Sequence, residues 1–125
     1  FFQYNVEEDD VYEILEACDI FASPSGFESF GITILEAWSK KKPVVVCDIP
    51  SVRHLVQEGE TGFTVPYKNT PQLAKTLVRL IDDPELRKKA GEQGYRKLIN
   101  NYGKEIIGEK YRRFYDKILS HEKKS

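Results

Sequence analysis

The stretch from residue 20 to residue 47 constrains the fold most, because it has the pattern of a strand, a turn, a helix and a second strand. It opens with the short apolar run Ile20-Phe21-Ala22, after which Pro24 and Gly26 break the extended segment. A helix is expected over about 30–40, and Val44-Val45-Val46-Cys47 is a β-branched run typical of a buried strand. Two strands joined through a helix run parallel in one sheet. The stretch therefore predicts an α/β fold.

The helix predicted over 30–40 has two different faces. At about 100° per residue, the polar arc holds Ser29, Thr33, Glu36 and Lys40, and the apolar arc holds Ile34, Leu35 and Trp38. Ser29 or Phe30 is the expected start, so free backbone N–H groups near Gly31, Ile32 and Thr33 favour an anion at this end. A nucleotide diphosphate suits such a helix end. The alternative is a polar arc that is only solvated, since two glutamates at the spacing of Glu28 and Glu36 also occur by chance.

The rest of the chain continues the alternation of helices and strands. Further helices are predicted over 10–18 and 51–58, from Thr70, from Pro84 and over about 103–120, and a third strand over 63–65. The last helix carries an apolar seam typical of a core or an interface, formed by Ile107, Tyr111, Phe114 and Ile118. The fold class is therefore α/β, a Rossmann-like parallel sheet with helices on both faces and a helical C-terminal tail. Ligands of such sheets bind beyond the carboxyl ends of the strands.

Composition and charge exclude several classes of function. The 125 residues suit one domain, and 19 Lys and Arg against 20 Asp and Glu give no bulk charge for a nucleic-acid partner. The sequence shows no apolar run of membrane-spanning length and no signal peptide. It also lacks a starting Met, so we expect a piece of a longer protein.

The cysteines and histidines give no sign of a metal or redox centre. Cys18 and Cys47 have no partner spacing of such a motif, so both are expected to be small buried residues in a reducing compartment, the cytoplasm. His54 and His121 lie far apart in the sequence, and His54 is expected on the surface. No protein-bound metal or cofactor is predicted.

Residues 24–46 carry a motif that resembles that of a known enzyme family. The motif reads Pro24-Ser25-x-x-Glu28-x-Phe30-Gly31-Ile32-Thr33-x-Leu35-Glu36-Ala37, followed by Pro43-Val44-Val45-Val46. It resembles the donor-binding motif of retaining glycosyltransferases with the GT-B fold, a group that includes glycogen and sucrose synthases and many mannosyltransferases. Residues 48–51 and 59–66 are similar to the segments that follow in that family. One departure is Lys41, where the family usually has a glycine in the left-handed conformation that closes the helix.

The resemblance implies roles for the residues of the motif. Glu36 would hydrogen-bond the ribose hydroxyls of a nucleoside-diphosphate sugar, and the N–H groups of Ile32 and Thr33, with the Thr33 hydroxyl, would hold the diphosphate. Glu28, with the N–H groups of Phe30 and Gly31, would orient the sugar, and Glu28 is the candidate catalytic residue. Whether Glu28 acts chemically or only positions the sugar is left open, as are the sugar, the base and the acceptor.

The resemblance also implies that residues 1–125 form only part of a donor-binding domain, within the C-terminal half of a GT-B enzyme. The Arg and Lys that neutralise the diphosphate, and the acceptor-binding domain, would precede Phe1. Helix 103–120 would pack toward that missing domain. The isolated chain is therefore predicted to bind donor weakly and not to turn over, and peripheral membrane association is compatible with the sequence. The alternative is a non-catalytic α/β module for assembly or regulation. A different nucleotide binder would need a Gly-x-Gly-x-x-Gly or phosphate-loop motif, which the sequence lacks.

Overall fold

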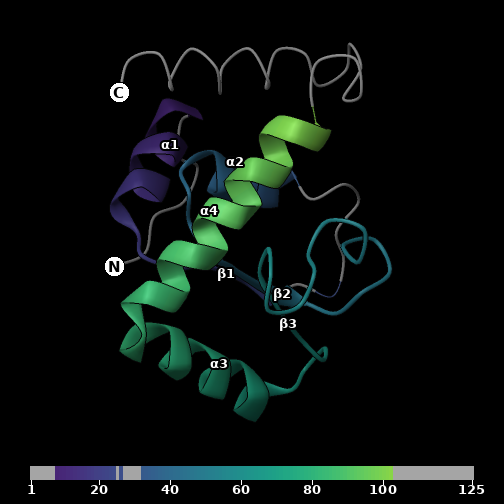
Figure 1. Ribbon diagram of the computed structural model, residues 1–125. Helices are drawn as coiled ribbons and strands as arrows, with labels where there is room; N and C mark the ends of the chain where they lie inside the picture. The colour runs from purple at the N-terminus through teal and green to yellow at the C-terminus, as the bar shows by residue number, and fades with distance from the viewer. Residues whose placement is uncertain (1–7, 25, 27–31, 103–125) are drawn as a thin grey trace.

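A computed structural model describes residues 8–24, 26 and 32–102 (Figure 1). The elements in chain order are α1 (Glu8–Ala17), β1 (Phe21–Ser23), α2 (Ile32–Ser39), β2 (Val44–Cys47), β3 (Phe63–Val65), α3 (Thr70–Asp82) and α4 (Pro84–Asn101). These elements match the predicted alternation to within one or two residues at most ends. The predicted helix over 103–120 lies outside the described residues.

The three strands form a parallel sheet in the order β1-β2-β3. Val44 pairs with Phe21 of β1, and Val45 pairs with Phe63 of β3. All four residues of β2 are buried, as expected for a central parallel strand that is covered on both faces. The prediction of an α/β fold with a parallel sheet is confirmed.

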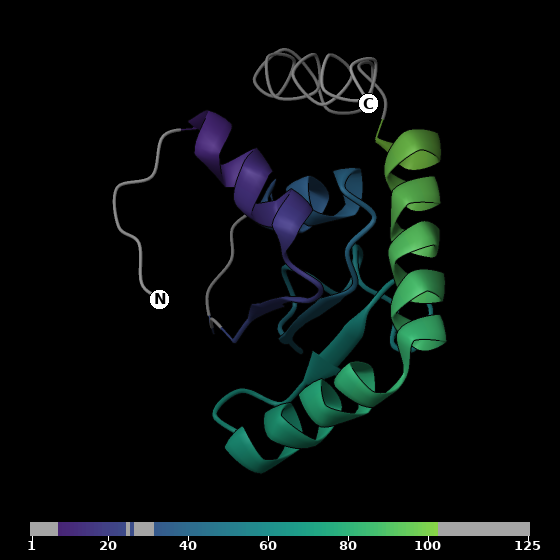
Figure 2. The same cartoon turned by 90° about the vertical axis from the view of Figure 1, so that its left-hand side faces the viewer.

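The helices cover both faces of the sheet, and each face has its own apolar core. Val44 and Val46 face a cluster with residues of α1 and α2, whereas Val45 faces a cluster with residues of α3. Figure 2 shows α1 and α2 on one side of the strands and α3 on the other. Helix α4 passes along the edge of these layers, with Ala90 in the α3 cluster and Leu98 in the α2 cluster. It thereby ties the two layers together.

Helix α4 crosses α2 closely because it has glycines at the contact. A Cβ atom at Gly94 would overlap the indole of Trp38, and one at Gly91 would overlap the carbonyl group of Lys41. Trp38 is fully buried, and its Nε1 donates a hydrogen bond to the carbonyl oxygen of Thr61 at 3.1 Å. One side chain therefore joins α2, α4 and the turn before β3.

Helix α2 ends in a Schellman motif. The N–H of Lys42 donates to the Ala37 carbonyl at 3.0 Å and that of Lys41 to the Trp38 carbonyl at 2.9 Å, while Lys41 has φ of 56°. The left-handed position expected from the family resemblance is therefore present, although a lysine occupies it. The ammonium of Lys41 lies 4.8 Å from the ring centroid of Tyr95 in α4, a cation–π contact that offsets part of the strain.

The prediction of a helix over 51–58 is wrong. The structure has a run of turns there, in which the N–H of Val52 donates to the Ile49 carbonyl at 3.1 Å and that of Leu55 to the Val52 carbonyl at 2.9 Å. The apolar stripe that suggested a helix is nevertheless buried, and it consists of Val52, Leu55 and Val56. The stripe predicted correctly which residues are buried, but it did not predict the backbone conformation.

Side chains outside this segment, one near in the sequence and one distant, end it early. The hydroxyl of Thr61 donates to the Leu55 carbonyl at 3.3 Å and accepts from the N–H of Gln57 at 2.9 Å. The ammonium of Lys97 in α4 donates to the carbonyl oxygens of His54 at 2.9 Å and Leu55 at 2.5 Å. Because these side chains satisfy the backbone groups, the segment needs no further helical turns.

Candidate donor site

The carboxyl ends of the three parallel strands lie at one edge of the sheet, and the segment between β1 and α2 leaves from that edge. Pro24 and Gly26 are the described residues of this segment. The thiol of Cys47, at the end of β2, donates to the Pro24 carbonyl oxygen at 3.0 Å. Burial raises the pKa of the Cys47 thiol, which keeps its proton available for this bond. The start of the segment is thus fixed to the neighbouring strand.

Helix α2 presents the polar arc that the sequence predicts. Thr33 is exposed and Glu36 is half-buried, three residues and therefore about 4.5 Å apart along the helix axis. The opposite arc is buried against the sheet and contains Ile34, Leu35 and Trp38. The first turn of α2 holds no acidic side chain, so nothing in that turn opposes an anion at the positive end of the helix.

The predicted site residues fall into two groups. Ile32, Thr33 and Glu36 belong to α2, and the structure places them on one helix beside the carboxyl edge of the sheet. The backbone N–H groups of Ile32 and Thr33 lie in the first turn, where N–H groups have no intrahelical acceptor. Glu28, Phe30 and Gly31 lie outside the described residues, so their placement stays a prediction.

Lysines at the far end of α2 have other partners. The ammonium of Lys40 forms an ion pair with Glu16 of α1 at 3.2 Å, and that of Lys41 lies over the Tyr95 ring. Both ammonium groups therefore bind partners at the C-terminal end of the helix. They lie away from its N-terminus, where the diphosphate is expected.

A shallow pocket of about 100 Å³ lies at the same edge of the sheet, next to Pro24. The loop between β3 and α3 forms much of its wall, including Tyr67, Lys68 and Asn69. The volume is below the roughly 300 Å³ of a typical small-molecule site, so the pocket does not by itself accommodate a nucleotide sugar. The sequence did not predict that this loop lies beside Pro24. It contained only two hints of turns in this region, namely Pro66 after the third strand and Gly26 after the first.

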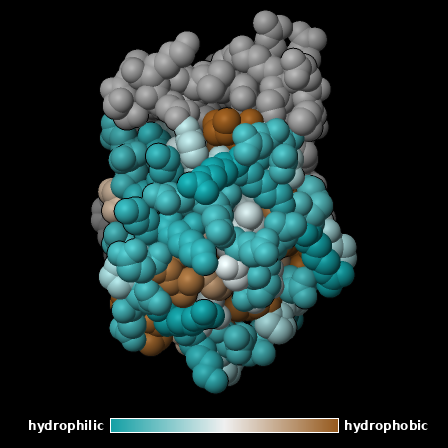
Figure 3. All heavy atoms as spheres, viewed as in Figure 1, coloured by the Kyte–Doolittle hydropathy of each residue, from teal (hydrophilic) through white to brown (hydrophobic). Residues whose placement is uncertain are grey.

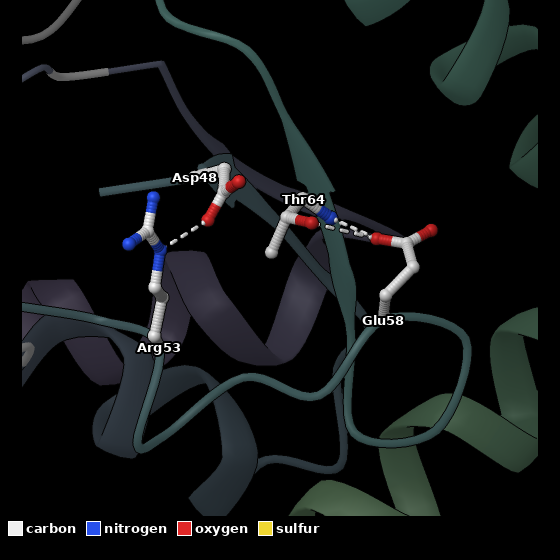
Figure 4. A network of polar contacts seen from close by, with 4 residues as sticks. All are labelled: Asp48, Arg53, Glu58 and Thr64. Atoms are coloured by element: carbon white, nitrogen blue, oxygen red, sulfur yellow. Dashed lines mark hydrogen bonds and ion pairs between the residues drawn. The ribbon is translucent and has the colours of Figure 1, made fainter. Parts of the chain in front are cut away.

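Two polar contacts shape the loops beyond β2 and before β3 (Figure 4). Nε of Arg53 lies 2.8 Å from Oδ1 of Asp48, at the carboxyl end of β2. Oε2 of Glu58 accepts from the backbone N–H of Thr64 at 2.5 Å and from its hydroxyl at 2.9 Å. Both contacts are exposed and hold the loops by hydrogen bonds rather than by burial.

Other candidate chemistry is weak in the described part of the chain. His54 is exposed, as predicted. Among residues 8–24, 26 and 32–102, no three or more His, Cys, Asp or Glu side chains gather as metal ligands, and no helix is long and apolar enough to span a membrane. Figure 3 shows one face of the molecule as mostly hydrophilic, with separate hydrophobic spots.

Comparison with known proteins decides the family. The model of the family described as Glycosyl transferases group 1 matches residues 1–97. The chain belongs to this family. The chain is 34% identical over 100 residues to alpha-D-kanosaminyltransferase of Streptomyces kanamyceticus, and the match covers 80% of this chain and 26% of that enzyme.

Solved structures show the same fold. The C-terminal domain of LpcC, a group 1 glycosyl transferase of Francisella tularensis, is 28% identical with a TM-score of 0.74, over 82% of this chain and 52% of that chain. HepE of Anabaena, solved in complex with UDP-glucose, is 24% identical with a TM-score of 0.71, over 90% of this chain and 30% of that chain. The chain therefore has the GT-B type of α/β architecture. It spans about a quarter to a third of the length of the first curated relatives that it matches.

Proposed function

We propose that this chain is the nucleotide-sugar-binding part of a retaining glycosyltransferase, which transfers a sugar from a nucleoside-diphosphate sugar to an acceptor. The observation that carries the proposal is α2, which begins beside the carboxyl edge of a parallel sheet and presents Thr33 and Glu36 on its outward arc. Family membership makes sugar transfer the chemistry to expect of such a site. The shared fold of HepE, solved with UDP-glucose, agrees with a nucleotide sugar as the ligand.

Glu36 is proposed to bind the ribose. Its carboxylate offers two acceptor oxygens, which match the two neighbouring hydroxyl donors of a ribose ring. Hydrogen bonds to a charged group are about twice as strong as neutral ones. Glu36 is half-buried on the outward arc of α2.

The first turn of α2 is proposed to bind the diphosphate. The N–H groups of Ile32 and Thr33, together with the exposed Thr33 hydroxyl, would donate to its oxygens. Negative charge grows on the leaving diphosphate as the glycosidic bond breaks. Donors that are already fixed in place stabilise this charge without reorganising, so they lower the barrier.

Glu28, Phe30 and Gly31 are proposed to bind the sugar ring. Glu28 would accept from sugar hydroxyls, and the N–H groups of Phe30 and Gly31 would donate to them. In this scheme Glu28 orients the ring so that the acceptor attacks from the face that the diphosphate leaves, which retains the configuration at the anomeric carbon. No protein-bound metal or cofactor is needed for these roles.

The other parts of the reaction are assigned to residues outside this chain. The cations that neutralise the diphosphate would lie there, and so would the acceptor-binding domain. Helix 103–120 would pack toward that domain. We therefore expect the isolated chain to show weak donor binding and no transfer. The cytoplasm is the proposed location, because Cys18 and Cys47 are both free thiols.

The test is a titration of the full-length protein with UDP-glucose, UDP-N-acetylglucosamine and GDP-mannose by calorimetry. Glu36→Ala should weaken the binding of the preferred donor by on the order of tenfold or more, the cost of a hydrogen bond to a charged group. Glu13→Ala, an exposed glutamate on α1, is the matched control and should bind as the wild type does. Absent binding, or equal binding by the wild type and Glu36→Ala, would favour the non-catalytic module instead. NMR of the transfer product would show retention or inversion.

A further inference from the structure

We propose that the outward side of α3 is a self-association surface, which binds the same helix of a second copy of this chain in antiparallel orientation. This inference concerns a surface apart from the donor site and does not depend on the proposed function. Helix α3 lies at the lower end of the molecule in both Figure 1 and Figure 2, with no other described element beyond it. Within the described part of the chain, its outward side is therefore open to a partner.

Helix α3 is apolar on two sides. Its inward side packs on the apolar core beside β3 through Leu73, Leu77 and Leu80. Its outward side carries a second stripe of exposed residues, which consists of Pro71, Ala74, Val78 and Ile81. The exposed fraction is 55% for Val78 and 61% for Ile81. One apolar side is enough for a helix that only covers a sheet, so the outward stripe indicates a second partner.

The spacing of the outward stripe fits another helix. Its four residues follow one another at intervals of three, four and three, which is the pattern of the seam between two paired helices. The stripe is about 15 Å long at about 1.5 Å per residue. A shallow groove of about 400 Å³ lies along it, lined in part by Ala74, Lys75 and Val78. An aliphatic side chain of a facing helix can enter such a groove, as a knob enters a hole.

The charges beside the outward stripe favour a second copy of α3 as this helix. Lys75 and Asp82 are both exposed and lie about 10 Å apart on the same flank of α3, with the positive charge nearer the N-terminus. Neither of them forms an ion pair with another described residue. An antiparallel copy reverses the order of the charges, so Lys75 of each copy would face Asp82 of the other. The two helix dipoles would also run in opposite directions, which is favourable.

The charge pairs and the apolar stripe agree on one register. Pairing of Lys75 with Asp82 puts the twofold axis between residues 78 and 79, so residue 81 of one copy lies level with residue 76 of the other. Ile81 therefore enters between Ala74 and Val78 of the other copy, which both line the groove. Because each copy contributes one short helix, the buried area is small, and we expect a weak and reversible dimer.

An anionic membrane is a less suitable partner for the same surface. Asp82, Asp83 and Glu85 are exposed at the C-terminal end of the stripe, and an anionic lipid surface would repel them. The guanidinium of Arg79 lies 5.7 Å from the ring centroid of Phe63, a core residue, and is therefore directed toward the sheet. The surface thus carries both signs of charge, which suits a copy of itself.

The experiment is sedimentation velocity of the full-length protein from low micromolar to near-millimolar concentration. Lys75→Glu and Asp82→Lys should each weaken self-association by on the order of tenfold or more, because each variant places like charges together at both contacts. An equal mixture of the two variants should form a dimer at least as tight as that of the wild type, since one copy is then acidic at both positions and the other basic at both. Glu13→Lys reverses an exposed charge on α1, across the sheet from α3, and is the matched control.

The apolar contact has its own variant. Ile81→Ser changes an exposed side chain, so its thermal midpoint should stay close to that of the wild type while self-association weakens by on the order of tenfold. A wild type that stays monomeric at the highest concentration, or a mixture of the two charge variants that does not associate, would overturn the proposal. So would a dimer that neither charge reversal weakens. Binding to phosphatidylserine vesicles without self-association, abolished by Lys75→Glu, would assign the surface to a membrane instead.

Discussion

Trp38 offers the most direct test of how the two layers of helices are held together. Its side chain is fully buried, donates to the Thr61 carbonyl at 3.1 Å and lies against Gly94 of α4. Trp38→Phe keeps a ring in the core but removes the N–H group and part of the volume. We expect a stable fold with a clearly lower free energy of unfolding.

The expected loss has two parts. Leaving the buried Thr61 carbonyl without this donor costs about 1–3 kcal/mol. The smaller ring leaves a void of roughly 40 Å³, which at about 24 cal/mol per Å³ adds about 1 kcal/mol. The sum of about 2–4 kcal/mol is a large share of the roughly 5–15 kcal/mol of a typical domain. In urea, with a slope of about 2 kcal/mol/M, the midpoint should fall by about 1–2 M.

The assay is urea unfolding followed by circular dichroism, with Val78→Ala as the control. Val78 is 55% exposed on α3, so its variant should stay within about 0.5 kcal/mol of the wild type. Gly94→Ala should cost about 1–3 kcal/mol by overpacking the indole, and less in the Trp38→Phe background. If Trp38→Phe shifts the midpoint no more than Val78→Ala does, the indole does not hold α2, α4 and the turn together.

Two further predictions follow from the backbone and from the thiols. Lys41 at φ of 56° carries strain of about 1–2 kcal/mol, partly offset by about 0.5 kcal/mol from the Tyr95 ring. Lys41→Gly should therefore raise the unfolding free energy by up to about 1 kcal/mol, whereas β-branched Lys41→Val should lower it; equal values would contradict the strain. Burial raises the pKa of Cys47 above 9.0, so the unfolded chain loses this proton first and the stability from the buried thiol declines as pH rises above that value. Urea midpoints should fall more steeply above pH 9.0 for the wild type than for Cys47→Ala, and parallel slopes would refute the burial effect.

Local patterns in the sequence predicted most of the fold. The run Val44–Cys47 was recognisable as a central strand because four consecutive apolar residues need cover on both faces. The two arcs of α2 followed from helical periodicity, and its buried residues confirm them. The prediction of a helix over 51–58 failed because the side chains of Thr61 and Lys97, which lie outside the segment, bind its backbone groups. A periodic stripe shows which residues are buried but not which partners satisfy the backbone.

The candidate site was predictable to the extent that it lies on one helix. Thr33 and Glu36 share the outward arc of α2 because both belong to a continuous periodic segment. The contact of Tyr67 with Gly26 depends on how two loops from different strands meet. Neither loop has a repeating pattern, so single-sequence reasoning had no basis for pairing them. The family resemblance supplied the roles of the motif residues, but it did not predict this contact.

Glu36 is assigned the central role in the donor site, the binding of the ribose. Its direct test compares the affinity of the full-length protein for a ribonucleoside diphosphate with that for the 2′,3′-dideoxy analogue, in the wild type and in Glu36→Ala. The wild type should prefer the ribonucleotide by about 10- to 100-fold, from hydrogen bonds to a charged acceptor. Glu36→Ala should lose most of this preference while its affinity for the dideoxy analogue changes little. An unchanged preference in Glu36→Ala would contradict the assignment of α2 as the nucleotide-binding helix.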